Sequence, residues 1–217
     1  MKSVASLHLQ YKEPVASKLQ PEFYLRKNVL QITRELIGKF LVTNFDGTIT
    51  SGMIVEAEAY NGAIDKASHA YNNRRTKRNE VMYAEGGVTY VYLCYGIHHL
   101  FNVVTNYKDI PHAILIRAIV PADGIDTILY RRKQKLNKKI SDGPGTLSIA
   151  LGIKTTHSGI SLSGNEIWIE DRGVKFGKKD IVTSPRIGVD YAGEDAKLHY
   201  RFRLREELIA GLLKEVV

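Results

Sequence analysis

The sequence predicts a single mixed α/β (α+β) domain in which β-hairpins alternate with helices. Its 217 residues are more than the ~150 of a typical domain and fewer than two such domains would need. Hydrophobic residues make up 44% and charged residues 25%, which is ordinary globular usage and argues against disorder, collagen or a coiled coil. Apolar residues recur at helical spacing in some segments and alternate in others, with no internal repeat or linker. Residues 1–24 show no period, so we expect an N-terminal arm before a folded domain of residues 25–217.

The first regular elements are predicted to be a helix followed by a hairpin. From residue 28 apolar side chains recur at helical spacing, and Gly38 offers a stop. Residues 40–43 and 52–59 have the composition of strands. Asp46-Gly47 between them is a strong hairpin signal, so we expect the two strands to pair.

The rest of the chain is predicted to contain a second hairpin, more strands and further helices. Residues 61–80 are polar and are expected to form a loop with one short helix at most. Residues 88–95 and 97–105 are rich in Val, Tyr and Phe and flank Gly96, which predicts a tight hairpin, and 112–120 is a further strand. The later elements are expected to be a helix at 123–136, an apolar segment at 146–151, strands at 166–170 and 197–205, and a helix at 206–214.

The charge balance favours anionic partners. Lys and Arg number 31 against 23 Asp and Glu, a formal net charge of +8. Such a surface suits nucleic acid first, and an acidic membrane face or acidic protein next. The 12 tyrosines would suit stacking on bases, although Tyr also fills half-buried sheets.

Several classes of site are disfavoured by what the sequence lacks. Its single cysteine, Cys94, excludes an intramolecular disulfide and a cysteine-rich zinc site, and favours a reducing compartment. No spacing of ligands predicts a metal, and no nucleotide-binding glycine motif predicts a cofactor. The charge-free stretch at 86–107 is better explained by two strands than by a membrane helix. No secretory signal is visible, so we expect an intracellular protein, cytoplasmic or nucleoid-associated in a bacterium.

The strand at residues 55–60 carries the most informative pattern. Because side chains alternate along a strand, Glu56, Glu58 and Tyr60 would share one face while their neighbours face the core. Carboxylates two residues apart lie ~7 Å apart, and partial burial would keep a proton on one of them near neutral pH. The alternative is a solvated strand face with two ordinary glutamates.

Two basic clusters and one hairpin tip are further candidates. Arg74, Arg75 and Arg78 form a compact group that could bind phosphates, or could simply lie on a solvated loop. A second basic run at 131–139 has the same two interpretations. Tyr95 and Ile97 stand at the predicted hairpin tip, where they are either an exposed wedge able to unstack bases or part of the core.

Many ordered motifs together resemble the alkyladenine (3-methyladenine) DNA glycosylase family. The resemblance covers roughly residues 28–205. Its motifs are residues 55–62, Asp65, 67–69, Thr76, 78–79, Met82, 90–92, 95–96, Asn102, 115–118, 142–145, 185–189 and 191–193. The chain departs from the family pattern at Ala63, Lys77 and Thr146, where Pro, Pro and Lys are common, respectively.

The resemblance implies a monofunctional DNA glycosylase of base excision repair. Such an enzyme flips a damaged purine out of duplex DNA and hydrolyses its bond to deoxyribose, with 3-methyladenine as the type substrate and hypoxanthine and ethenoadenine as further candidates. It implies a curved antiparallel sheet with flanking helices and a protruding hairpin that enters the minor groove. It also implies a monomer without a metal or other cofactor.

The resemblance also implies the catalytic residues. Glu58 would be the general base for the attacking water, and Arg117 and the Ile187 carbonyl would hold that water. This fits the chemistry, because a carboxylate beside an oxocarbenium-like sugar accepts a proton and stabilises the positive charge.

The remaining site residues implied by the family bind the base and the DNA. Tyr60 and His69 would stack on one face of the flipped base, and Tyr92 on the other. Asn102 would disfavour guanine by crowding its exocyclic amine, and Tyr95 would fill the gap left in the duplex. Two alternatives remain at this point: a non-catalytic DNA-binding protein of the same fold, and a carbohydrate glycosidase that uses Glu56 and Glu58 as its acid and base pair.

Overall fold

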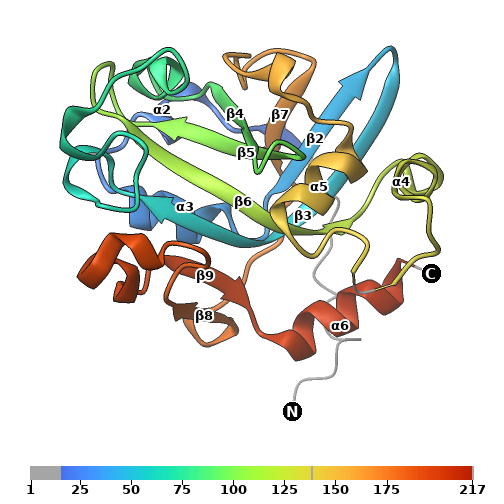
Figure 1. The fold of residues 1–217 in the computed structure, drawn as a ribbon. Helices are drawn as coiled ribbons and strands as arrows, with labels where there is room; N and C mark the ends of the chain where they lie inside the picture. Colours follow the sequence, from blue (N-terminus) through green and yellow to red (C-terminus); the bar gives the residue numbers. More distant parts are fainter. Residues whose placement is uncertain (1–15, 138, 217) are drawn as a thin grey trace.

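The computed structural model describes residues 16–137 and 139–216. Within them an antiparallel sheet curls around the core, with strand order β1-β7-β2-β3-β6-β5-β4 (Figure 1). The two remaining strands form a ribbon in which β9 pairs with β8 and with β3. The strands are β1 (Ser17–Lys18), β2 (Phe40–Phe45), β3 (Thr48–Tyr60), β4 (Thr89–Cys94), β5 (His98–Thr105), β6 (His112–Pro121), β7 (Ile167–Asp171), β8 (Ile181–Ser184) and β9 (Arg201–Leu204).

Helices cover the sheet and its ends. The α-helices are α2 (Pro21–Tyr24), α3 (Val29–Leu36), α4 (Ile125–Arg132), α5 (Pro144–Leu151) and α6 (Glu206–Glu215). The short 3₁₀ turns are η1 (Gly62–Ile64), η2 (Tyr71–Asn73), η3 (Glu80–Tyr83), η4 (Thr155–His157), η5 (Lys178–Asp180) and η6 (Asp190–Lys197). Asn28 caps α3 by accepting a hydrogen bond from the Gln31 amide at 3.0 Å, which explains why the helix begins where its apolar period does. No described helix is long and apolar enough to cross a membrane.

Strand β3 is a central strand of the sheet and is paired along both of its edges. Its first half pairs with β2 on one edge, its second half pairs with β9 on the same edge, and β6 pairs along the other edge. From Thr50 to Ala59 every residue of β3 is buried, on both faces. The main core contains β3 and β6 residues with α3, α5 and Phe101 of β5, so the polar residues of β3 lie in the interior rather than at the surface.

Two compensating irregularities interrupt the pairing of β3 with β6. Ile54 lies opposite Ile119, Glu56 opposite Ala118, and Ala57 opposite Ile116. Val55 is therefore an extra residue on β3 and Arg117 an extra residue on β6. Bulges of this kind re-aim side chains without losing the register beyond them, and this pair lies beside Glu56 and Glu58.

The single α+β domain and most of its elements confirm the prediction from sequence. Both hairpins, the helix after Asn28, the strands at 112–120 and 166–170 and the terminal helix are all present. Four regions differ. Residues 61–83 contain three 3₁₀ turns, β8 was not predicted, and the strand expected at 197–205 is confined to β9, which follows η6 after three residues. The helix expected at 123–136 ends at Arg132, because Lys133 takes a left-handed conformation with φ of 50°.

The N-terminal segment is only partly covered by the description. Residues 1–15 of the expected arm lie outside the described residues. The rest packs on the fold, since Ser17 and Lys18 pair with β7 and Tyr24 is fully buried.

Candidate active site

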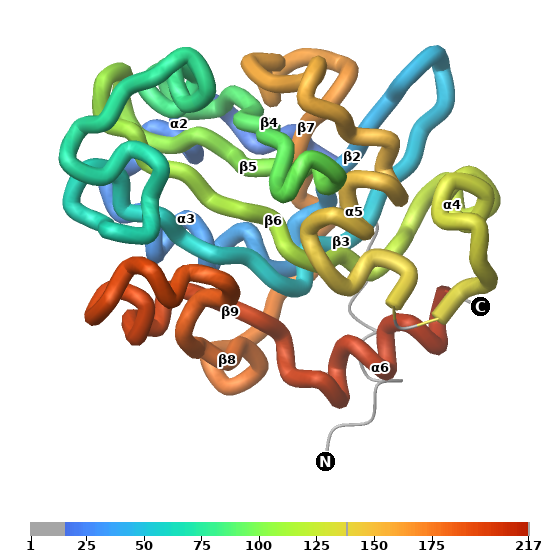
Figure 2. Tube along the Cα trace, in the orientation of Figure 1, coloured from blue at the N-terminus to red at the C-terminus, as the bar shows by residue number. Residues whose placement is uncertain are grey.

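A cavity of about 250 Å³ opens where the β4–β5 hairpin meets two loops. One loop joins β3 to β4, and the other joins β8 to β9. These segments are far apart in sequence yet lie side by side (Figure 2), because the Lys66 amide bonds to Asp195 and the Tyr191 hydroxyl to the Ala67 carbonyl. The cavity is lined by Tyr60, Ala67, Ser68, His69, Met82, Tyr90, Tyr92, Cys94, Tyr95, Leu100, Asn102, Ala113, Leu115, Arg117, Ile187, Gly188, Val189 and Tyr191. Its size, slightly below the usual ~300–1,000 Å³ of ligand pockets, and its aromatic lining suit one flat ring system.

Glu58 lies fully buried behind this lining. Its Oε2 accepts a hydrogen bond from the Tyr60 hydroxyl at 2.9 Å, and its Oε1 accepts one from the Ile187 amide at 2.9 Å. Arg117 Nη1 lies 3.4 Å from the same Oε1. Burial raises the pKa of Glu58, while Arg117, the Ile187 amide and the Tyr60 hydroxyl oppose that rise. A buried carboxylate with a raised pKa beside a cavity is suited to accept a proton.

Glu56 has a different environment, although it is only two residues away. Arg117 Nε donates to its Oε1 at 2.9 Å, and Arg201 and Arg203 of β9 lie within 3.3 and 2.5 Å of its oxygens. Both glutamates are buried, so the alternative of a solvated strand face is wrong. Glu56 is held by three guanidinium groups, whereas the two hydrogen-bond donors of Glu58, Tyr60 and Ile187, line the cavity. This difference argues against an acid and base pair of a carbohydrate glycosidase.

The aromatic residues predicted to grip a base do converge on the cavity. Tyr60, His69 and Tyr92 all line it. His69 Nδ1 lies 2.9 Å from the Tyr90 hydroxyl, and burial lowers the pKa of His69 to about 4, so its ring is neutral at physiological pH. The His69 and Tyr92 rings meet edge to face with centroids 4.7 Å apart. Because rings at that distance are already in contact, a base can lie between them only after one of the two rings moves.

Asn102 lines the cavity, and hydrogen bonds to the backbone hold its side chain in place. It is buried, and its Nδ2 donates to the carbonyls of Tyr90 and Leu100 at 3.0 and 3.2 Å. Both acceptors belong to the β4–β5 hairpin, so the amide is fixed in place with respect to Tyr92 on the same hairpin.

The tip of that hairpin is exposed rather than part of the core. Tyr95 is 90% and Ile97 69% exposed, so the interpretation of these two residues as part of the core is wrong. Tyr95 and Gly96 have φ of 50° and 73°, and the Ile97 amide bonds to the Cys94 carbonyl, so a tight turn presents both apolar side chains. A tyrosine with positive φ is uncommon, and such strain is typical of functional sites.

The basic loop is less uniform than its sequence suggests. Arg75 is paired with Glu80 at 2.6 Å and with Asp109 at 2.8 Å, and its guanidinium covers the Tyr83 ring. Arg78 donates to the Leu93 carbonyl at 3.3 Å and lies over Tyr92, with its Cζ 5.2 Å from the ring centroid. No ion pair of Arg74 is present among the described residues. Arg74 and Arg78 therefore keep a charge for a partner, whereas the charge of Arg75 is already compensated.

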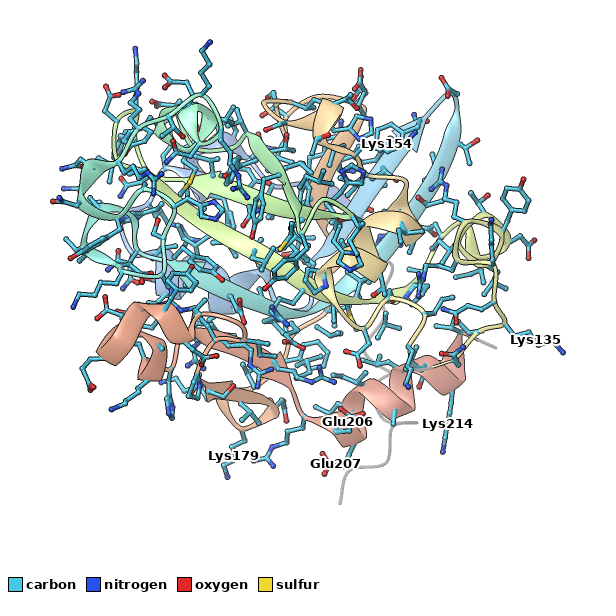
Figure 3. The ribbon with its side chains drawn as sticks, in the orientation of Figure 1. Lys135, Lys154, Lys179, Glu206, Glu207 and Lys214 are labelled. Atoms are coloured by element: carbon cyan, nitrogen blue, oxygen red, sulfur yellow. The ribbon has the colours of Figure 1, made fainter. Side chains whose placement is uncertain are left out.

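The second basic run is also partly used within the fold. Arg131 donates to Thr50 and to the Ala150 carbonyl, and Arg132 donates to the Ile140 carbonyl at 2.7 Å. Lys135 projects outward from the loop after α4 (Figure 3). Lys138 lies outside the described residues.

Reasoning from sequence gave no role to the pair of Arg186 and Asp65, or to Tyr191. Arg186 and Tyr191 lie within the family motifs at 185–189 and 191–193, so the motifs identified both residues. The motifs did not indicate that Arg186 pairs with Asp65 or that Tyr191 bonds to Ala67. In the described part of the chain, no cluster of three or more His, Cys, Asp or Glu could hold a metal ion.

Comparison with known proteins places these features in a family context. The family model described as methylpurine-DNA glycosylase matches residues 22–208. A protein of Chlamydia abortus named "Putative 3-methyladenine DNA glycosylase" is 47% identical over 188 residues, which cover 86% of this chain and 97% of that protein. Proteins of the same name from Chlamydia felis and Clostridium perfringens are 45% and 41% identical, again over 86% and 87% of this chain and 95% and 96% of theirs.

Proposed function

The chain belongs to the methylpurine-DNA glycosylase family, and we propose that it flips an alkylated or deaminated purine into the aromatic cavity and uses Glu58 as the general base that releases it. As a member of that family it is a hydrolase that cleaves N-glycosidic bonds in DNA and acts in DNA repair. The finer proposal covers bases of the 3-methyladenine type, with hypoxanthine and ethenoadenine as further candidates, excised from duplex DNA by a monomer. In a bacterium the proposed site of action is the nucleoid.

The observation that carries the proposal is the buried Glu58 carboxylate at the back of an aromatic cavity. The proposed reaction begins with a water molecule beside Glu58, held also by Arg117 and the Ile187 carbonyl. Glu58 takes the proton of this water as its oxygen attacks the sugar carbon, and the bond to the purine breaks with its electrons passing to the base. The ionised carboxylate also stabilises the positive charge that develops on the sugar.

The cavity wall suits a positively charged leaving base. N-alkylated purines such as 3-methyladenine are cations, and the electron-rich faces of Tyr60 and Tyr92 favour them. A neutral His69 adds a third ring without the repulsion that an imidazolium would cause. The proposed order of events has Tyr92 rotating away from His69 to admit the base, while Asn102 limits the entry of guanine. Arg78, which covers Tyr92, would move with it or contact the DNA backbone.

The decisive experiment replaces each glutamate of β3 in turn. Glu58→Gln keeps the size of the side chain but cannot accept the water proton, so single-turnover release of methylpurines from methylated duplex DNA should fall ~10²–10⁴-fold while DNA affinity is retained. Glu56→Gln should cost much less per folded molecule. Equal losses in the two variants would show that Glu58 is not the base, and retained excision in Glu58→Gln would overturn the mechanism. The alternative of a non-catalytic DNA-binding protein predicts no release from the wild type.

A further inference from the structure

A buried ion pair lies behind the cavity and takes no part in the mechanism above. Arg186 Nη1 and Nη2 donate to the two Asp65 oxygens at 2.5 and 2.8 Å. The two side chains are 0% and 1% exposed. Burying two charges is expensive unless their geometry is well matched, so a pair this deep calls for an explanation beyond stability.

The pair connects three segments that surround the cavity. Asp65 also accepts hydrogen bonds from the Asn61 and Ala67 amides, at 3.0 Å each, which shapes the loop between Tyr60 and His69. Arg186 also donates to the carbonyls of Ala59 at the end of β3 and Asp195 in η6, at 2.9 and 3.2 Å. One guanidinium thus fixes β3, the His69 loop and the β8–β9 loop relative to one another.

Both hydrogen-bond donors of Glu58 are linked to Arg186, one through the main chain and the other through a contact with the guanidinium. Ile187, whose amide bonds to Glu58 Oε1, follows Arg186 directly in the chain. The ring of Tyr60, whose hydroxyl bonds to Oε2, lies against Arg186 with its centroid 4.8 Å from Cζ. A movement of Arg186 would therefore change both bonds at once.

The contacts at position 186 require an arginine, and another cation could not make all of them. Its planar fork meets both Asp65 oxygens and stacks on Tyr60, which an ammonium group cannot do. Among the described residues its Nε has no hydrogen-bond partner although it is buried, so the contacts of this guanidinium are those of its two terminal nitrogens.

We propose that Arg186 and Asp65 are positioning residues of the glycosylase reaction, which set the distance and direction of the two hydrogen bonds that Glu58 receives from Ile187 and Tyr60. The inference rests on the proposed role of Glu58 as the base. It predicts that loosening the pair alters the acidity of Glu58 and hence the pH range in which the enzyme works.

The charged and titratable groups that face Glu58 determine how loosening the Arg186–Asp65 pair would change the pKa of Glu58. They are Glu56 and Tyr60 on β3, Arg117 on β6, Arg201 opposite it on β9, Arg186 in the loop before η6, and Tyr191 in η6. Both hydrogen bonds act to lower the pKa of Glu58. If Arg186→Lys keeps the charge but misaligns both donors, the pKa of Glu58 rises further and the enzyme needs a higher pH to become active.

The test compares Arg186→Lys with the wild type by single-turnover excision from a duplex with one hypoxanthine, across pH and with uncatalysed base release subtracted. We expect a ~10- to 100-fold lower rate on the plateau, as for other small misplacements of reacting groups, and an acidic limb at higher pH. Affinity for undamaged duplex should stay within ~2-fold, because the pair lies behind the cavity. Asp65→Glu, which keeps the charge of the carboxylate but displaces it from the guanidinium, should shift the limb in the same direction.

Arg172→Lys is the matched control. Arg172 also bonds two carboxylates, Asp123 and Glu170, and lies over the ring of Phe40, but none of these partners is a hydrogen-bond donor of Glu58. It should lose thermal stability as Arg186→Lys does, with its pH profile unchanged. Rates are compared at a temperature where circular dichroism shows each variant folded.

Two outcomes separate this inference from the proposed function. If Arg186→Lys loses stability but keeps the acidic limb of the wild type, the pair is only structural and the inference is overturned. If Glu58→Gln, assayed on the same duplex, excises as fast as the wild type, the proposed function fails whatever Arg186→Lys does. A loss in Glu58→Gln together with a shifted limb in Arg186→Lys supports both.

Discussion

Two glutamates of one strand differ because of what surrounds each of them. Glu56 receives three guanidinium groups, whereas Glu58 receives one neutral hydroxyl, one amide and a single guanidinium at longer range. Alternation along β3 predicted that both share a face, and this was sufficient to select them. It could not predict which of the two would be held by β9, since Arg203 is 147 residues away in sequence.

Tyr60→Phe tests the electrostatics of Glu58 with the smallest possible change. The variant keeps the ring over Arg186 and removes the hydroxyl, which burial and Glu58 keep protonated by raising its pKa. Without this donor the ionised carboxylate is less stable, so Glu58 holds its proton to higher pH. We expect the acidic limb of the single-turnover rate to move up by roughly one pH unit, equivalent to ~1.4 kcal/mol. A limb that stays in place or moves to lower pH contradicts this assignment.

Elements with local signals were predictable, and elements that depend on distant partners were not. Asp46-Gly47 and Gly96 marked both hairpins, and the apolar period after Asn28 marked α3. Strand β8 has four residues, three of them half-buried, and exists because it pairs with β9. The bulges at Val55 and Arg117 likewise depend on how β3 and β6 pair. The sequence therefore identified Arg117 as a site residue but did not predict that it lies in a bulge.

The β4–β5 hairpin offers a test at the scale of an element. A flipped nucleotide leaves a hole that an exposed Tyr95 can fill by stacking, worth ~1–3 kcal/mol per base. Tyr95→Ala should therefore lower excision from duplex DNA by about 10- to 100-fold at subsaturating enzyme, and Tyr95→Phe should be mild because the hydroxyl is not needed. Since Tyr95 is 90% exposed, the melting temperature should hardly change. A large loss of stability with normal excision per folded molecule would assign Tyr95 to the sheet.

Across the whole molecule, net charge is a poor guide to which cations are free to meet DNA. The formal charge of +8 includes cationic side chains that are already ion-paired or hydrogen-bonded within the fold as well as those that are free. Arg117, Arg186, Arg201 and Arg203 hold buried or half-buried carboxylates, and Arg131 and Arg132 bond to the backbone. The net charge of the sequence includes these paired arginines together with the free cations. They cannot be told apart from sequence, because only the fold brings each arginine to its partner.

The salt dependence of DNA binding distinguishes paired from free cations. Each phosphate contact releases counterions and contributes ~0.9 to the slope of log K against log salt on duplex DNA. Arg74→Ala and Arg78→Ala should each reduce the slope by about one, measured on undamaged duplex between ~50 and ~200 mM salt. Arg75→Ala is the matched control from the same loop. Because Glu80 and Asp109 already compensate its charge, its slope should remain that of the wild type. Equal reductions in all three variants would mean that the pairing of Arg75 yields to DNA, and no reduction in any of them would remove this loop from the DNA path.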